Sequence, residues 1–361
     1  MSSSKTADAR KRWLFSAPID LAVFGGTAAI ALALVALAPM LGIGNDTPEW
    51  SWITGVLLVD VAHVWSTSFV VYLDPVEWRR RPALYALTPL AMFGVGIALY
   101  AWGADAFWRA IAYLAVFHFV RQQYGWVMLY RARNGERDRL GRWIDGATVY
   151  MATIYPLVWW HAQLPRGFAW MKPGDFVTGV PPWLADAAGV VYVALLAIYI
   201  ARAVHQLATR RPVSWGKHLV VATTSACWYV GIVSTNTDFT FTVTNVFIHG
   251  VPYMALVYLY ARNAAREPEA RGGVNAKILT KARGLVIFLS TLWFIAYAEE
   301  LVWDRGLWHD REWLFGSGFD IGDGGALILA PLLAVPQLTH YVLDAFLWRR
   351  RANPRLGRIL G

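Results

Sequence analysis

The feature that most constrains this chain is a series of apolar stretches, each about as long as a membrane-spanning helix. Crossing the hydrocarbon core of a bilayer takes about 20 mainly apolar residues in one helix. Because lipid offers no water to the backbone, continuously apolar runs rich in Ala and Leu are typical of helices and not of barrel strands. We find about ten such stretches, at 20–41, 51–73, 83–101, 107–130, 147–160, 183–201, 218–233, 239–260, 282–298 and 325–348.

Composition supports this interpretation. The 361 residues are 57% hydrophobic and 16% charged, whereas soluble domains carry about 25% charged residues. The net charge is +9, and the basic residues lie in short runs between the apolar stretches. This distribution argues against nucleic acid as a partner. The single cysteine, Cys227, excludes a disulfide within the chain and a cage of thiolate metal ligands.

The positions of Lys and Arg predict the orientation. With the N-terminus inside, most of the 33 basic residues fall in the inner connections and the two tails, as the positive-inside rule requires. We therefore predict an all-α, polytopic integral membrane helical bundle of about ten transmembrane helices with both termini cytoplasmic. A single transmembrane domain at 20–348 would lie between an N-terminal tail (1–19) and a basic C-terminal tail (349–361). We expect it in the lipid bilayer of a bacterial inner (plasma) membrane.

Ionisable side chains inside a bilayer are costly and mark functional positions. Four predicted helices each carry one histidine with a polar residue three or four positions away, and residues at that spacing share a helix face. The pairs are Asp60 and His63, His118 and Gln122, Asn245 and His249, and His340 and Asp344.

The four histidines are expected at a similar depth. Their helices all run from outside to inside, and each histidine stands 9 to 13 residues before the first inner charge. At a rise of 1.5 Å per residue this is about 14–20 Å, close to one plane near mid-bilayer. Neutral imidazole binds Fe, Zn or Cu, and its second ring nitrogen usually donates to a carboxylate or an amide.

The pattern therefore predicts His63, His118, His249 and His340 as metal ligands. Gln122, Asn245 and Asp344 would orient their rings. The open alternatives are a haem site, a proton relay, or four structural histidines, each satisfied by its own partner.

Arg121 lies beside these groups in the fourth stretch and cannot lose its charge. Its depth is similar to that of Asp60, so we predict an ion pair between the two. The alternative is that Arg121 holds the polar end of a substrate. Arg121 and Asp60 are accordingly the candidate catalytic groups.

The segments around the histidines resemble the Brp/Blh-like membrane proteins, which cleave β-carotene to retinal. The similar sequence segments are DVAHVW, FHF, VFIHG and VPQLTHYVLDAF. The resemblance implies one non-haem iron held by histidines from several membrane helices. The chain departs from that family at Gln337, where the final motif has a histidine. His63 also lacks the proline-histidine-glycine motif, and His249 stands alone where the family has a pair, so carotenoid cleavage stays open.

Together these features predict a membrane-embedded, non-haem iron oxygenase acting on an apolar lipid or isoprenoid substrate. The chain has no HxxxH or HH pair, which argues against the dinuclear sites of membrane desaturases and alkane hydroxylases. Two other classes remain as alternatives. One is a transporter or proton-relay protein that uses the same His, Asp and Arg groups, and the other is a haem-binding electron carrier.

Overall fold

The computed structural model describes residues 13–349 and 353–360, and every regular element within them is a helix. Seven helices among these residues are long and apolar enough to cross a membrane. They coincide with seven of the predicted stretches and are consistent with a helical membrane bundle. They span Ala17–Leu37, Glu49–Val71, Pro82–Trp102, Pro182–Ala208, Asp238–Ala264, Gly284–Trp308 and Gly322–Leu347.

The three remaining predicted stretches, 107–130, 147–160 and 218–233, are also helical. They fall in α8 (Ala104–Arg133), in α9 (Arg139–Ala162), and in α11 (Trp215–Trp228) with its continuation η3 (Tyr229–Ser234). These helices are not among the seven candidates, so the total of ten spans and the cytoplasmic placement of both termini stay predictions. Some basic residues on which the orientation depends, Lys5, Arg10, Lys11, Arg12, Arg350 and Arg351, lie outside the described residues.

The contacts group the chain into two compact units, and the single transmembrane domain at 20–348 stays a prediction. Unit 1 comprises Met1–Ser51 and Val116–Pro252, and unit 2 comprises Trp52–Ala115 and Tyr253–Gly361. Two helices, α8 and α12 (Asp238–Ala264), pass from one unit into the other.

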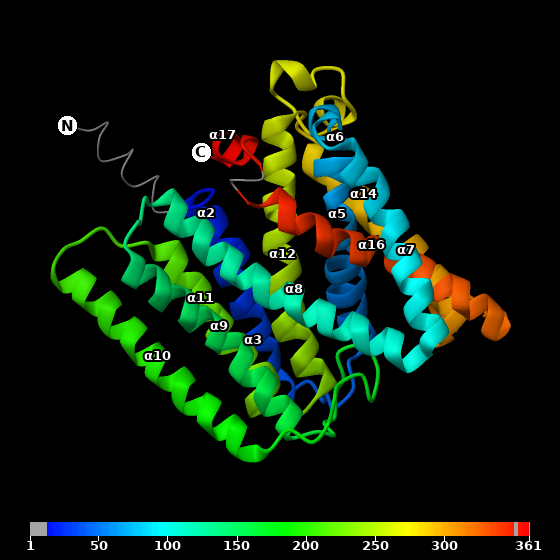
Figure 1. The fold of residues 1–361 in the computed structure, drawn as a ribbon, viewed down its shortest axis with the longest axis horizontal. Helices are drawn as coiled ribbons and strands as arrows, with labels where there is room; N and C mark the ends of the chain where they lie inside the picture. The colour runs from blue at the N-terminus through cyan, green and yellow to red at the C-terminus, as the bar shows by residue number, and fades with distance from the viewer. Residues whose placement is uncertain (1–12, 350–352, 361) are drawn as a thin grey trace. The chain divides into compact units, whose positions relative to one another are not determined.

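In unit 1, the first candidate span joins α2 (Ala17–Asp20), η1 (Leu21–Gly26) and α3 (Thr27–Leu37) into one helix. Helix α9 packs between α10 (Pro182–Ala208) and α11 (Figure 1). Local chemistry sets the start of both α9 and α10. The Asp138 carboxylate caps α9 by accepting from the Gly141 N–H at 2.8 Å. Pro182 occupies the first position of α10, where a missing N–H costs nothing.

A buried ionic network ties the ends of these helices together. The carboxylate of Asp145, fully buried, accepts from Lys217 at 2.9 Å, from Arg202 at 2.8 Å and from Arg131. Lys217 is only 1% exposed. The sequence placed these three basic residues in inner connections, whereas two of them are buried because their charges are paired.

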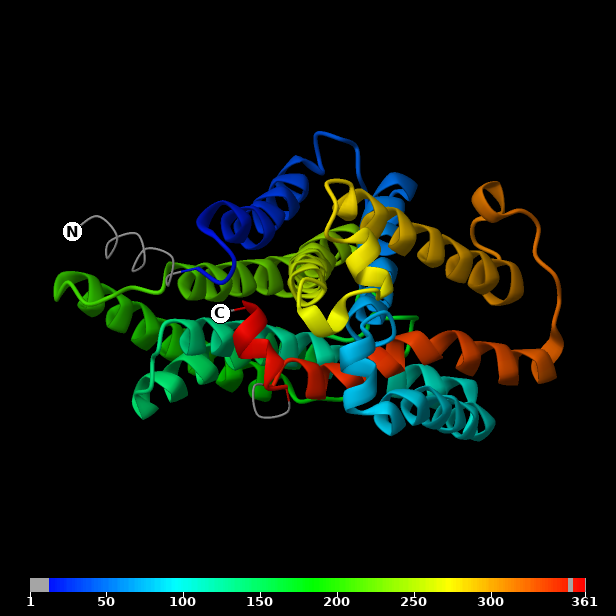
Figure 2. The same ribbon diagram turned by 90° about the horizontal axis from the view of Figure 1, so that it is seen from above.

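Unit 2 begins with η2 (Trp52–Val61), a π-helical segment that continues the short α4 (Glu49–Ser51) into α5 (Ala62–Val71). The long helix α16 (Gly322–Leu347) packs along α7 (Pro82–Trp102), as Figure 2 shows, and it also contacts α5. The close approach depends on Gly96, because a Cβ atom there would lie 2.9 Å from the Cβ of Pro331. The short helices of this unit are α6 (Pro75–Arg80), η4 (Pro268–Ala270), α13 (Val274–Ile278), α15 (Glu312–Phe315) and α17 (Arg355–Leu360).

Two predicted boundaries differ in unit 2. The ninth stretch was expected to end at residue 298, but α14 (Gly284–Trp303) continues through η5 (Asp304–Trp308). The predicted C-terminal tail is partly built into the unit, because Arg355 is 4% exposed and binds Asp74 at 3.0 Å and Glu267 at 2.7 Å. Although burial alone would lower the pKa of the Arg355 guanidinium, these carboxylates raise it.

Candidate metal centre

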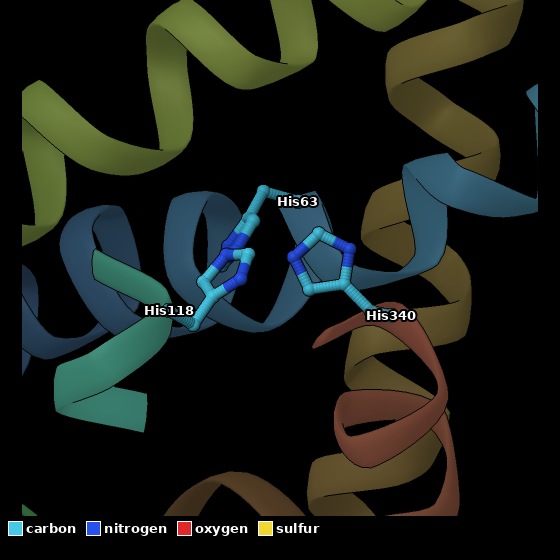
Figure 3. Close-up of side chains that lie close together, drawn as sticks. All are labelled: His63, His118 and His340. Carbon is cyan, nitrogen blue, oxygen red and sulfur yellow. The ribbon is translucent and has the colours of Figure 1, made fainter. Parts of the chain in front are cut away.

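Unit 2 buries two of the predicted ligands side by side. His63 lies in α5, two residues after the π-helical η2, and His340 lies in α16. They are 2% and 1% exposed. Their ring centroids are 5.1 Å apart with planes at 82° (Figure 3). Two imidazoles that bind the same ion at about 2.1 Å have ring centroids about this far apart. The neighbouring π-helical turn is a second indication, because such turns are frequent at functional sites.

A chain of hydrogen bonds sets the tautomer of His340. The indole N–H of Trp348 donates to Asp344 Oδ1 at 3.0 Å, so this oxygen is an acceptor. Tyr253 donates its only hydroxyl proton to the same oxygen. Thr67, whose Oγ1 lies 3.2 Å from the Tyr253 hydroxyl, must then donate there. Thr67 Oγ1 is also 2.8 Å from Nδ1 of His340. Because the Thr67 hydroxyl donates its one proton to Tyr253, it can only accept from His340. Nδ1 of His340 therefore carries the proton, and Nε2 presents the lone pair.

The predicted carboxylate partners lie farther away than a direct hydrogen bond allows. Asp344 Oδ1 is 3.8 Å from Nδ1 of His340. Asp60 Oδ1 is 3.6 Å from Nδ1 of His63. At these distances the carboxylates act on the rings through their charge and not through a bond of good geometry.

Unit 1 buries the other two predicted ligands, again as a pair. His118 lies in α8 and His249 in α12, with centroids 5.1 Å apart and planes at 82°. They are 5% and 0% exposed. The ring of Phe119 stacks on His249 at 3.5 Å and 7°, and its edge contacts Trp170 at 5.0 Å. This stacking holds the imidazole plane of His249.

The two amide residues of unit 1 contact the main chain and not the imidazole rings. Nε2 of Gln122 donates to the backbone carbonyl of His249 at 2.8 Å. That carbonyl lies in the turn before Pro252, where proline disturbs the helical hydrogen bonds. Nδ2 of Asn245 donates to the carbonyl of Phe241 at 3.0 Å. The predicted role of these amides in orienting the rings stays a prediction.

Arg121 has aromatic partners within its own unit. Its guanidinium donates to the hydroxyl of Tyr150 and lies over the ring of Tyr124 at 5.0 Å. These contacts offer a cation–π interaction and an oxygen acceptor without a carboxylate. The predicted pair with Asp60, a residue of unit 2, stays a prediction.

Sequence reasoning missed three residues of the unit 2 centre and one of unit 1. They are Thr67, Tyr253, Trp348 and Phe119. A spacing signal existed for some of them: Thr67 is four residues after His63, Tyr253 is four after His249, and Trp348 is four after Asp344. Hydroxyl and indole groups are common in membrane helices and at their ends, so this signal did not stand out.

Comparisons of the chain with protein-family models, with curated proteins and with solved structures find no match.

Proposed function

We propose that this chain is a membrane-embedded oxygenase in which His63, His118, His249 and His340 hold one non-haem iron. Its substrate would be an apolar lipid or isoprenoid that reaches the centre from the bilayer. The observation that supports this proposal is the pairing of buried imidazoles, one pair in each unit, with each pair at the same 5.1 Å ring separation. Histidines that served only to satisfy a local partner would have no reason to pair.

The donor chemistry fits such an ion. Neutral imidazole nitrogens are ligands of iron, zinc and copper, and a hydrogen bond to the second ring nitrogen is the usual support. Thr67 provides that bond at Nδ1 of His340, which leaves Nε2 as the ligand atom. Bound iron would supply the activation of dioxygen. The protein would hold the ligand rings, exclude water, and keep apolar walls around the substrate.

The hydrogen-bond chain also favours a second candidate, a proton relay. His340, Thr67, Tyr253 and Asp344 form a continuous path of exchangeable protons inside unit 2. Buried paths of this kind carry protons in membrane transporters. In this candidate the histidines would titrate and would bind no metal.

Metal content distinguishes the two candidates. The test is elemental analysis of the full-length protein purified in mild detergent, beside two double variants, His63→Ala/His340→Ala and His118→Ala/His249→Ala. The exposed His205 of α10 offers a matched control as His205→Ala. We expect about one iron per chain in the wild type and the control, and loss of iron from both double variants.

Other outcomes are informative. Retention of iron by His118→Ala/His249→Ala would contradict the four-histidine ligand set. A wild-type protein without metal after expression in iron-rich medium would overturn the oxygenase. Proton uptake into liposomes by that metal-free protein, lost in Tyr253→Phe, would support the relay instead.

A further inference from the structure

Two side-chain oxygens beside the unit 1 histidines are buried without a hydrogen-bond donor among the described residues. They are Oε1 of Gln122 and Oδ1 of Asn245. Asn245 is only 2% exposed. Buried polar atoms almost always have partners, and an orphan acceptor costs about 1–3 kcal/mol. Such atoms are therefore where a ligand or an ordered water is expected.

The identity of these atoms as oxygens is settled by their surroundings. An amide can usually be rotated to exchange its nitrogen and oxygen. Here the other end of each amide faces a backbone carbonyl, that of His249 for Gln122 and that of Phe241 for Asn245. A carbonyl only accepts, so the nitrogen must lie there. The remaining atom of both amides is an acceptor.

Both amide residues lie one helical turn from a histidine of the imidazole pair. Gln122 follows His118 by one turn of α8, and Asn245 precedes His249 by one turn of α12. Residues four apart lie on one helix face, so each acceptor lies beside a proposed ligand. The next amide of α8, Gln123, differs because its Oε1 accepts from Thr224 of α11 at 3.0 Å.

We propose that these acceptors form a polar subsite for the hydroxyl group of the substrate, which makes the substrate an isoprenoid or lipid alcohol. The hydroxyl group is inferred from these acceptors, whereas the apolar remainder of the substrate rests on the proposed function. A hydroxyl carries the proton that an orphan carbonyl oxygen lacks. An aldehyde, an ester or a carboxylate offers only acceptors and repels these oxygens, and a hydrocarbon leaves them unsatisfied.

The test is equilibrium binding of three probes with one carbon skeleton, namely farnesol, farnesal and the hydrocarbon farnesane, to the protein in lipid nanodiscs. We expect the wild type to bind the alcohol about tenfold more tightly than either of the others, the value of one buried hydrogen bond. Because one hydroxyl proton bonds one of the two acceptors, at least one of Asn245→Leu and Gln122→Met should remove this preference. Both variants should leave the affinity for farnesane unchanged. The matched control Gln123→Met should keep it.

Equal binding of alcohol and aldehyde by the wild type would overturn the subsite. So would retention of the preference in both Asn245→Leu and Gln122→Met, or no binding of any probe. Iron is measured on the same samples, so the two proposals fail separately. Preference for the alcohol in a metal-free protein would support the subsite and contradict the oxygenase. Bound iron without a preference for the alcohol would support the iron site and contradict the subsite.

Discussion

Thr67→Val is the sharpest test of the centre in unit 2. Valine has nearly the shape of threonine and the same β-branch, so α5 is expected to keep its conformation. The substitution removes only the hydroxyl, which lies 2.8 Å from Nδ1 of His340 and 3.2 Å from the hydroxyl of Tyr253. It therefore breaks the hydrogen-bond chain at the link that determines the tautomer.

The size of the effect follows from burial. Because His340 is 1% exposed, its N–H would lose its acceptor where water cannot replace it. An unsatisfied buried donor costs about 1–3 kcal/mol. Removal of a group that supports a metal-binding histidine typically lowers metal affinity by about 10–100-fold. The two estimates agree, so we expect iron binding to weaken by about 10–100-fold in Thr67→Val.

The assay is competition for iron between the purified protein and a chelator of known affinity. Thr67→Ser is the matched control, because it keeps the hydroxyl and loses only a methyl group. It should bind iron within about fourfold of the wild type, since one buried methyl group contributes about 0.8 kcal/mol. If Thr67→Val binds as the wild type does, the tautomer argument is wrong. If both variants weaken binding equally, packing and not the hydroxyl supports the ring.

Three further predictions concern the framework, and unfolding in mixed SDS micelles measures each as a change in unfolding free energy. Asp145→Asn should cost about 3–5 kcal/mol because it leaves buried cations unpaired. The carboxylate of Asp138 is half-exposed, so Asp138→Asn should cost under about 1 kcal/mol. Equal losses in the two variants would contradict the role of burial. Gly96→Leu should cost about 1–3 kcal/mol by overpacking against α16, and Gly94→Ala, with open space around its Cβ, should be harmless. Arg355→Gln should cost about 3–5 kcal/mol by leaving the buried carboxylate of Asp74 without a cation. A neutral outcome would show that the C-terminal segment is dispensable.

Much of the fold was predictable because length and hydropathy are local properties. Seven of the predicted stretches are helices of membrane-crossing length and apolarity. The predicted end of the ninth stretch at residue 298, just before Glu299 and Glu300, was wrong, because the helix runs on to Trp308. Within that helix Glu299 is not a bare charge, because it accepts from the indole N–H groups of Trp65 and Trp303.

The candidate site was predictable in part. The spacing of polar residues in apolar helices identified all four buried histidines, because a charged or polar group in lipid stands out from its neighbours. It did not identify Thr67 and Tyr253, whose importance depends on helices distant in sequence. The ring-orienting roles of Gln122 and Asn245 stay a prediction, and their amide nitrogens donate to backbone carbonyls.

The sequence by itself determined that the chain is helical and that its apolar stretches suit a bilayer. It also determined which four histidines lie within those apolar stretches, each with a polar residue one turn away. These properties follow from the helical repeat and from the cost of polar groups in lipid, which each segment carries alone. Only the tertiary structure decided that His63 pairs with His340 and His118 with His249, and which nitrogen of His340 holds its proton. Those outcomes depend on side chains from separate helices meeting at hydrogen-bond distance, which no local pattern specifies.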